Sequence, residues 1–206
     1  MQVRRILATG LAAVAILPAY LRAMTVSGPS DAPTLILGDQ VLVNLAAYRV
    51  SIPYTGWTMW RRAGPARGDM VMFHVPNRGV RGLKRVIGLP GDTVELRENM
   101  VYLNGQAIGQ EPLERARFAP WISGEHKLEQ RVMREGRHWI AYSPGQSDLR
   151  TMPALTVPPG HYYVLGDQRD NSNDSRLFGM LEERHIQGRV EMHLRSARPR
   201  EMMPAW

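Results

Sequence analysis

The chain has 206 residues, of which 44% are hydrophobic and 22% are charged, a balance that excludes wholesale disorder. It contains no cysteine, which excludes disulfide bridges, thiol catalysis and thiolate metal sites. Lys and Arg total 26 against 19 Asp and Glu, so the formal net charge is +7. Such a surface suits anionic lipid or nucleic acid, and charge alone does not choose between them.

The N-terminus has the pattern of a membrane anchor. Arg4 and Arg5 precede the uncharged stretch 6–21, which covers about 24 Å as a helix and extends further if Arg22 reaches the far interface. We therefore expect one transmembrane helix over residues 1–25, with the remaining chain on the extracytoplasmic side of the cell (inner) membrane. A cleaved signal peptide has the same charged start and apolar middle, but the small residues of a cleavage site are not correctly spaced here.

Beyond the anchor, the apolar patterns are those of short strands bounded by turns. Strands are predicted over 70–75, 83–89, 93–96, 100–103, 161–165 and 189–195. Asn104-Gly105 is the strongest hairpin pattern in the chain. No long amphipathic helix follows the anchor. The predicted fold class is therefore mainly β, with an antiparallel β-rich core.

The stretch 106–160 differs from its surroundings, because it is polar, rich in Arg, Glu and Pro, and weakly patterned. We expect it to form an inserted variable subdomain or a set of long loops. The β-rich core then comprises residues 26–105 together with 161–196, and residues 197–206 form a C-terminal tail.

Aromatic residues cluster in the segment 54–60, which is followed by Arg61 and Arg62. One interpretation is a patch that contacts the membrane interface, where amphipathic rings and basic side chains are favoured. The other is a buried loop of core aromatics. The sequence leaves both open.

Ser30 follows the anchor closely and lies between Pro29 and Pro33. The spacing G-x-S-x-A is that of a nucleophile elbow, but the flanking prolines exclude the helix that an elbow requires. Either Ser30 is held on a rigid, extended turn, or the segment is a plain proline-rich linker.

Lys84 is one of two lysines among the 26 basic residues, the other being Lys127. Unlike arginine, lysine can lose its proton when it is buried. Strand alternation places Lys84 on the same face as Val86. If that face is the core face, burial disfavours the ammonium form, as a lysine general base requires. An exposed strand lysine is the alternative.

The segment 166–179 packs acids, amides, hydroxyls and two arginines between two glycines. A calcium loop is disfavoured, because Arg169 occupies a ligand position when the loop begins at Asp167. The six histidines form no H-E-x-x-H pair, so no metal and no cofactor is expected. A polar loop with internal Asp–Arg pairs fits better.

Together these segments resemble bacterial type I signal peptidases, which are membrane-anchored Ser/Lys endopeptidases that remove signal peptides from exported proteins. The resemblance covers most of the chain and is carried by S-D-A-P-T-L-I-L-G-D from Ser30, R-G-D-M-V-M-F from Arg67, K-R-V-I-G-L-P-G-D from Lys84, and the segment 166–179. It implies a core of paired antiparallel sheets. The stretch 106–160 matches only loosely.

The resemblance also implies roles for individual residues. Ser30 matches the nucleophile, with its backbone N–H in the oxyanion hole, and Lys84 matches the general base. The supporting positions are Ser172, whose hydroxyl would hold the lysine amine, the ion pair of Asp174 with Arg176, and that of Asp167 with Arg85. The positions expected around the substrate are Val26, Gly28, Leu35 and Leu83. Expected partners are preprotein signal peptides and the lipid bilayer, not nucleic acid, and the oligomeric state is left open.

Three positions depart from the family pattern. Asp31 replaces the usual methionine, and a carboxylate close to the site would favour the charged ammonium and oppose base catalysis. Pro29 is unusual before the nucleophile, and Gly28 lacks the serine hydroxyl that some members add to the oxyanion hole. Two alternatives therefore remain: a conjugative-transfer maturation peptidase with one dedicated substrate, and a non-catalytic anchored protein that binds signal peptides.

Overall fold

Strand pairing in this protein is antiparallel throughout the described region, apart from one parallel bridge between Ala141 and Gln168, so the mainly β prediction is confirmed. The computed structural model describes residues 19–52, 55, 57–76, 79–118, 130–142, 148–196 and 198.

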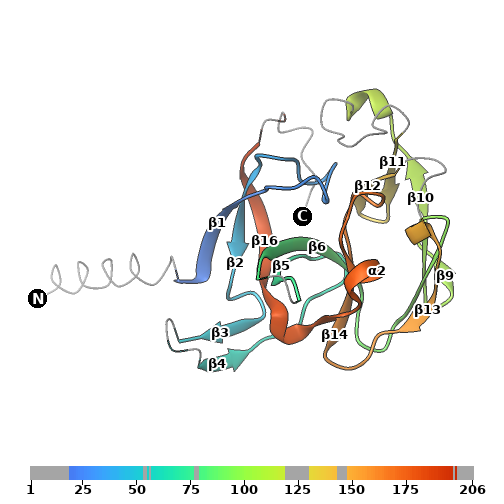
Figure 1. Cartoon of the computed structure of the whole chain (residues 1–206). Helices are drawn as coiled ribbons and strands as arrows, with labels where there is room; N and C mark the ends of the chain where they lie inside the picture. The colour runs from blue at the N-terminus through green and yellow to red at the C-terminus, as the bar shows by residue number, and fades with distance from the viewer. Residues whose placement is uncertain are drawn as a thin grey trace, which may run out of the picture.

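The largest sheet has seven strands in the order β1-β2-β16-β5-β6-β14-β15 (Figure 1). Its members are β1 (Leu21–Thr25), β2 (Gln40–Asn44), β5 (Met70–His74), β6 (Arg81–Gly88), β14 (His161–Leu165), β15 (Leu181–Glu182) and β16 (Ile186–Arg195). The strands predicted over 70–75, 83–89, 161–165 and 189–195 all belong to it. Because strands from both ends of the chain lie side by side here, the sheet brings together segments far apart in sequence.

Side chains alternate between the two faces of these strands, and the apolar side chains on the inner face form the hydrophobic core. On β2, Val41 and Val43 are fully buried and pack with Met70 and Met72 of β5 and Val190 of β16. Burying a side chain of this kind stabilises the fold by about 1.5–3 kcal/mol. This apolar cluster therefore joins β2, β5 and β16 beside the site described below.

β16 departs from the regular alternation that its sequence suggests. The register of its pairing shifts between Val190 and Met192 and again between His193 and Arg195. Regular alternation would place Met192 and Leu194 on the same face as the buried Val190, but they are about half exposed, at 49% and 48%. The extra residues at these irregularities re-aim the following side chains.

A second sheet contains the predicted hairpin and runs in the order β13-β7-β8-β9. Its strands are β7 (Thr93–Arg97), β8 (Met100–Leu103), β9 (Gln106–Ala107) and β13 (Met152–Thr156). Glu98 and Asn99 both have positive φ, as the two-residue turn between β7 and β8 requires, and Asn104-Gly105 turns the chain into β9.

Two smaller sheets complete the structure. One runs in the order β10-β11-β12, with bounds β10 (Gln110–Pro112), β11 (Arg131–Glu135) and β12 (His138–Tyr142); the other pairs β3 (Arg49–Ser51) with β4 (Thr58–Arg61). The helical elements are α2 (Ser175–Phe178) and the 3-10 turns η1 (Arg115–Arg117), η2 (Asp148–Arg150) and η3 (Glu183–His185). The described parts of the stretch 106–160 thus contain five strands, and β9 and β13 share a sheet with β7 and β8.

The expected anchor over residues 1–25 needs a correction at its end. Leu21–Thr25 is not helical, because it forms β1 and pairs in register with β2, from Leu21 opposite Asn44 to Thr25 opposite Gln40. Residues 1–18 lie outside the described residues. Within the described part of the chain, no helix is both long and apolar enough to cross a membrane.

The aromatic segment after β3 is exposed. Trp57, Met59 and Trp60 are 76%, 70% and 69% accessible to solvent, so the interpretation as a buried loop of core aromatics is wrong for these residues. Tyr54 lies outside the described residues. At the base of this hairpin, the hydroxyl of Tyr20 donates a hydrogen bond of 2.8 Å to the carbonyl oxygen of Ser51.

Candidate active site

The hydroxyl of Ser30 and the amine of Lys84 meet beside the seven-stranded sheet. Ser30 lies on the loop 26–39 between β1 and β2, and Lys84 lies on β6. Nζ of Lys84 donates a hydrogen bond of 2.5 Å to Oγ of Ser30 and one of 2.6 Å to the carbonyl oxygen of Leu83. Lys84 is only 4% exposed, so the exposed-lysine alternative is wrong. A nucleophilic hydroxyl and an amine at this distance can exchange a proton.

The loop that carries Ser30 is closed at its base and anchored at its tip. The N–H of Val26 donates to the carbonyl oxygen of Asp39 at 2.8 Å, and the N–H of Gly38 donates back to Val26 at 2.9 Å. Leu35 is fully buried in the core, and Ser30 itself remains partly accessible. The plain-linker interpretation is therefore wrong, because the loop is a fixed structure that presents its serine.

Asp31 adds a carboxylate to the same site. Its Oδ2 accepts a hydrogen bond of 2.8 Å from Oγ of Ser30, and both carboxylate oxygens lie 3.4 Å from Nζ of Lys84. Asp31 is 3% exposed. Burial raises the pKa of Asp31 above its ordinary value, although the charge of Lys84 opposes the shift. The carboxylate that the sequence places next to Ser30 thus contacts both members of the pair.

The segment after β14 packs against the backbone of Ser30. The N–H of Gln168 donates a hydrogen bond of 3.0 Å to the carbonyl oxygen of Ser30. A Cβ at Gly166 would lie 2.5 Å from that same oxygen and 2.2 Å from Oγ of Ser172, so only glycine fits. Ser172 therefore lies next to the site, but within the described region the Lys84 amine donates to Ser30, Asp31 and Leu83 and not to Ser172. Oγ of Ser172 is itself buried.

Two buried ion pairs lie behind the site, as the resemblance implied. Arg85 donates two hydrogen bonds to Asp167, at 2.8 and 2.6 Å. Burial alone would raise the pKa of Asp167, but the charge of Arg85 brings that pKa below its ordinary value. Arg176 binds Asp174 at 2.8 Å, and Asp174 also accepts from the N–H of Gly166 at 3.0 Å. Both pairs fix the 166–174 segment against β6 and α2.

A third buried pair was not predicted from the sequence. Glu135 at the end of β11 binds Arg169, and both side chains are fully buried. The backbones also join, because the N–H of Arg169 donates to Ala141 at 2.8 Å. The sheet β10-β11-β12, expected to be a separate insert, therefore supports the segment that holds Ser30. The charged residues were visible in the sequence, but nothing local paired them.

A fourth group of buried charges, also not predicted, fixes the far end of the Ser30 loop. Asp39 accepts hydrogen bonds from Ser196 at 2.6 Å and from Arg198 at 2.9 Å, and His193 lies 3.3 Å from the same carboxylate. Arg198 also donates to the carbonyl oxygens of residues 33 and 34. Residue 198, assigned to a C-terminal tail, is therefore part of the structure around the site.

The residues expected around the substrate lie in two settings. Val26, Leu35 and Leu83 are at most 5% exposed and belong to one apolar cluster, to which the Ser30 loop contributes Val26 and Leu35 and β6 contributes Leu83. Gly28 is partly accessible, and a Cβ built there meets nothing within 4 Å. The three apolar residues are therefore core residues at the base of the loop, whereas Gly28 faces open space.

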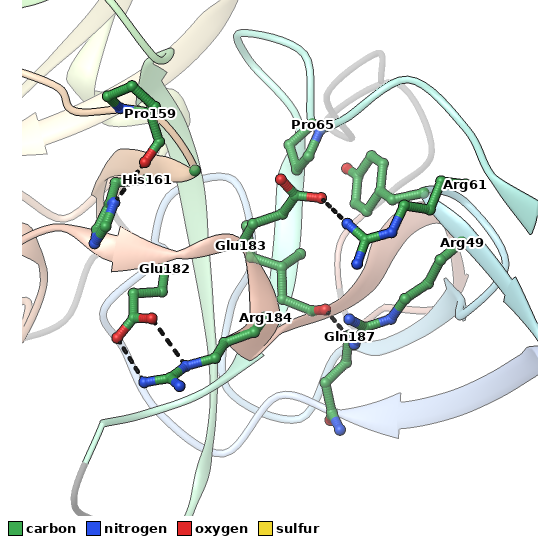
Figure 2. A pocket seen from close by; sticks show the side chains of 12 residues that line it. Arg49, Arg61, Pro65, Pro159, His161, Glu182, Glu183, Arg184 and Gln187 are labelled. Atoms are coloured by element: carbon green, nitrogen blue, oxygen red, sulfur yellow. Dashed lines mark hydrogen bonds and ion pairs between the residues drawn. The ribbon is translucent and has the colours of Figure 1, made fainter. Parts of the chain in front are cut away.

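A cavity of about 360 Å³ lies elsewhere, between the base of the β3–β4 hairpin and the β14–β15 region (Figure 2). Its charged side chains are already paired: Arg61 lies 3.6 Å from Glu183, and Arg184 lies 2.8 Å from Glu182. Neither Ser30 nor Lys84 lines it. In the region that the structure describes, no group of three or more acidic or histidine side chains is placed to hold a metal ion.

Comparison with known proteins gives consistent matches. The family model described as "Signal peptidase, peptidase S26" matches residues 2–194. Signal peptidase I of Pseudomonas aeruginosa is 34% identical over 170 residues, which cover 77% of this chain and 59% of that protein. Signal peptidase IB of Staphylococcus aureus strain COL is 33% identical over 166 residues, which cover 81% of this chain and 73% of that protein. A solved signal peptidase I from Enterococcus faecalis V583 matches with a TM-score of 0.41 and 32% identity, covering 63% of this chain and 98% of that one. The chain spans 59% of the length of the Pseudomonas aeruginosa relative.

Proposed function

The chain belongs to the signal peptidase family, peptidase S26, and on that premise we propose that it is a serine endopeptidase of the signal peptidase I type, which cleaves signal peptides from exported preproteins. The observation that carries the proposal is the 2.5 Å contact between Nζ of Lys84 and Oγ of Ser30, in a site where the lysine is almost completely buried. Each of the two residues is the partner that the other needs for covalent catalysis.

The proposed reaction uses the neutral amine of Lys84 as the general base. The amine takes the proton of Ser30 while Oγ attacks the scissile carbonyl carbon, and the carbonyl electron pair moves to its oxygen. Collapse of this intermediate breaks the peptide bond, and the proton held on Nζ passes to the leaving amine. Water then hydrolyses the acyl-enzyme by the same route, with Lys84 again acting as the base.

Stabilisation of the developing oxyanion is assigned to the backbone N–H of Ser30. Within the described chain this N–H donates to no other group, which supports the assignment. A second donor from a side chain at position 28 is absent, because Gly28 has none. We therefore expect a functional but incomplete oxyanion hole.

The ion pairs behind the site are proposed to act as positioning groups. Arg85 follows Lys84 directly on β6, so its two hydrogen bonds to Asp167 fix the strand at the base of the lysine. Asp174 and Arg176 hold Gly166, and hence Ser172, against the Ser30 loop. Rigid support of this kind keeps the two reacting groups within bonding distance.

The substrate is proposed to bind as an extended strand beside the Ser30 loop. Open space beside Gly28, and the apolar cluster that Val26, Leu35 and Leu83 form at the base of the loop, suit small side chains before the cleaved bond. A peptide in extended conformation offers backbone groups to a neighbouring strand and alternate side chains to the protein. Preprotein signal peptides are the substrates that match this description.

The membrane is proposed as the second partner. Residues 1–25 contain the uncharged stretch 6–21 that predicts a single anchor, and the exposed hairpin carrying Trp57 and Trp60 is tied to Tyr20 near the end of that stretch. Exposed indole rings are favoured at the interface between lipid and water. In this arrangement the site faces the extracytoplasmic surface of the cell membrane.

The test is cleavage of a preprotein by the full chain in detergent. Ser30→Ala and Lys84→Ala should each reduce kcat/KM by about 1000-fold or more while the circular dichroism spectrum is unchanged. Lys127→Ala, which removes the other lysine, is the matched control and should retain native activity. Full activity in either dyad variant contradicts the proposal.

The two alternatives have separate outcomes in this assay. A native protein that binds signal peptides without turnover is the non-catalytic binding protein suggested by Asp31. A native protein that cleaves one pilin-type precursor and no ordinary preprotein is the maturation peptidase. The Ser30–Lys84 contact favours turnover over binding alone.

A further inference from the structure

Asp31 completes a closed triangle of polar groups with the two residues of the proposed dyad. Lys84 donates to Oγ of Ser30 at 2.5 Å, and Oγ of Ser30 donates to Oδ2 of Asp31 at 2.8 Å. A hydroxyl has one proton, so in this arrangement the proton of Ser30 points to the carboxylate and not to the amine. In the structure, therefore, the Lys84 amine donates a hydrogen bond to Ser30 and does not accept the Ser30 proton.

We propose that Asp31 is a positioning residue that sets the pH range of the enzyme: its carboxylate keeps Lys84 in the ammonium form and holds the Ser30 proton, so cleavage begins only at more alkaline pH than it would with a neutral side chain at position 31. This inference rests on the proposed Ser30–Lys84 dyad. It adds a residue that the resemblance marks as a departure from the family pattern.

The physical basis is a short distance between opposite charges in a site closed to water. Both oxygens of Asp31 lie 3.4 Å from Nζ of Lys84, and the two residues are 3% and 4% exposed. An opposite charge this close favours the charged form of the amine, and screening by salt is weak in a buried site. Removal of the carboxylate charge therefore makes the amine easier to deprotonate.

The charged groups that face Asp31 come from two neighbouring elements. Lys84 approaches from β6, and Asp167 approaches from the segment after β14. Asp167 is bound by Arg85 through two hydrogen bonds, which leaves Lys84 as the cation paired with Asp31 in the described region. Asp31 and Lys84 accordingly form one buried ion pair.

The proton balance of the activation step is simple. The pair holds one proton between carboxylate and amine, and this proton leaves to water as hydroxide concentration rises. The free amine then accepts the Ser30 proton, which turns from Asp31 to Nζ as Oγ attacks the carbonyl carbon. Leaving-group departure and deacylation proceed as described above, and no further reactant is required.

The first measurement is the pH profile of kcat/KM from pH 6 to 10 for the full chain, with a preprotein substrate. Asp31→Asn keeps the shape of the side chain and removes its charge. The acidic limb of its pH profile should therefore lie at least one pH unit below that of the native enzyme, which corresponds to about a tenfold gain in activity at acidic pH. Asp31→Glu restores the charge and should return the acidic limb to its more alkaline position in the native enzyme. Superimposable native and Asp31→Asn profiles, or a shift of the variant to higher pH, would overturn the inference.

The second measurement does not depend on catalysis. Because the chain has two lysines, labelling with lysine enriched in ¹³C at Cε gives two resonances, and Lys127→Ala assigns them. The Lys84 resonance should titrate at least one pH unit lower in Asp31→Asn, while the Lys127 resonance is unchanged. An unchanged Lys84 midpoint overturns the role of Asp31. Activity retained by Ser30→Ala or Lys84→Ala instead overturns the dyad, so the two failures are distinguishable.

Discussion

The buried guanidinium of Arg198 donates a hydrogen bond of 2.6 Å to the carbonyl oxygen of Thr34, four residues beyond Ser30. It also binds the carboxylate of Asp39 at 2.9 Å, so one side chain near the C-terminal end of the described chain holds the loop that carries Ser30. Contacts between residues 164 and 159 positions apart in sequence thus fix the loop on which the serine hydroxyl lies.

Arg198→Ala should therefore destabilise the protein and slow catalysis. The substitution leaves a buried carboxylate and carbonyl groups without their donor, which costs about 2–4 kcal/mol. We expect a lower urea midpoint and a fall in kcat of about tenfold, because the loop that positions Ser30 is no longer fixed. Arg195→Ala is the matched control, since Arg195 is exposed on β16, and it should change stability by less than about 0.5 kcal/mol. Equal effects of the two substitutions would contradict this role.

Gly28→Ser should raise kcat by about tenfold. A Cβ at Gly28 meets nothing within 4 Å and the backbone there is not left-handed, so a serine fits without strain. Its hydroxyl would add the second oxyanion donor, and such a donor is worth about 100-fold or more where it is fully aligned. Gly28→Ala supplies the same Cβ without the hydroxyl and should leave kcat near the native value. Preprotein cleavage measures both; equal rates in the two variants would show that the hydroxyl does not reach the oxyanion.

Glu135 should make an acid-sensitive contribution to stability. Burial alone raises the pKa of Glu135, but the charge of Arg169 brings it down to about 2 from an ordinary 4.5. A carboxyl group with a lowered pKa stabilises the fold above its ordinary pKa, and this contribution is lost as pH falls from about 4.5 to about 2. Its size is about 3 kcal/mol.

Urea unfolding of the native protein and Glu135→Gln checks this prediction. The native protein should be more stable at pH 7, and the difference should shrink steadily between pH 4.5 and pH 2.5. Glu111→Gln is the control, because Glu111 pairs with Arg134 at the surface, where both side chains are at least half exposed. A Glu135→Gln difference that is constant with pH would contradict the buried ion pair.

The exposed β3–β4 hairpin should enter the lipid interface. In vesicles that contain brominated lipid, the tryptophan fluorescence of the full chain should be quenched, and the double variant Trp57→Phe/Trp60→Phe should lose most of that quenching. Trp139→Phe is the control, because Trp139 packs against Phe118 in the apolar interior. Quenching that persists in the double variant would place the hairpin away from the membrane.

Local sequence patterns predicted much of this fold. The apolar run at Met70 and the motif that begins at Lys84 predicted β5 and β6, and the Asn104-Gly105 pair predicted the turn into β9. These predictions succeed because strand alternation and turn conformation depend on neighbouring residues. The resemblance, not periodicity, paired Ser30 with Lys84.

The features that the sequence did not predict depend on register between distant segments. Apolar character alone continued the expected anchor through Leu21, although pairing with β2 makes that segment a strand. Irregular register in β16 turns His193 inward to Asp39, which alternation cannot anticipate. The Glu135–Arg169 pair likewise joins side chains whose proximity arises only when two sheets pack.

Chemical rescue of position 84 tests the central claim most directly. The native chain has no cysteine, so Lys84→Cys introduces its single thiol. Alkylation of the unfolded variant with 2-bromoethylamine, followed by refolding, rebuilds an amine at the end of a side chain of lysine length, whereas iodoacetamide adds an uncharged amide. Native protein carried through the same treatment controls for refolding. We predict that preprotein cleavage is absent in the variant, returns to at least about a tenth of the native rate with the amine, and stays absent with the amide. Cleavage by the unmodified or amide-bearing protein, or a correctly folded amine-bearing protein without activity, would contradict Lys84 as the base that activates Ser30.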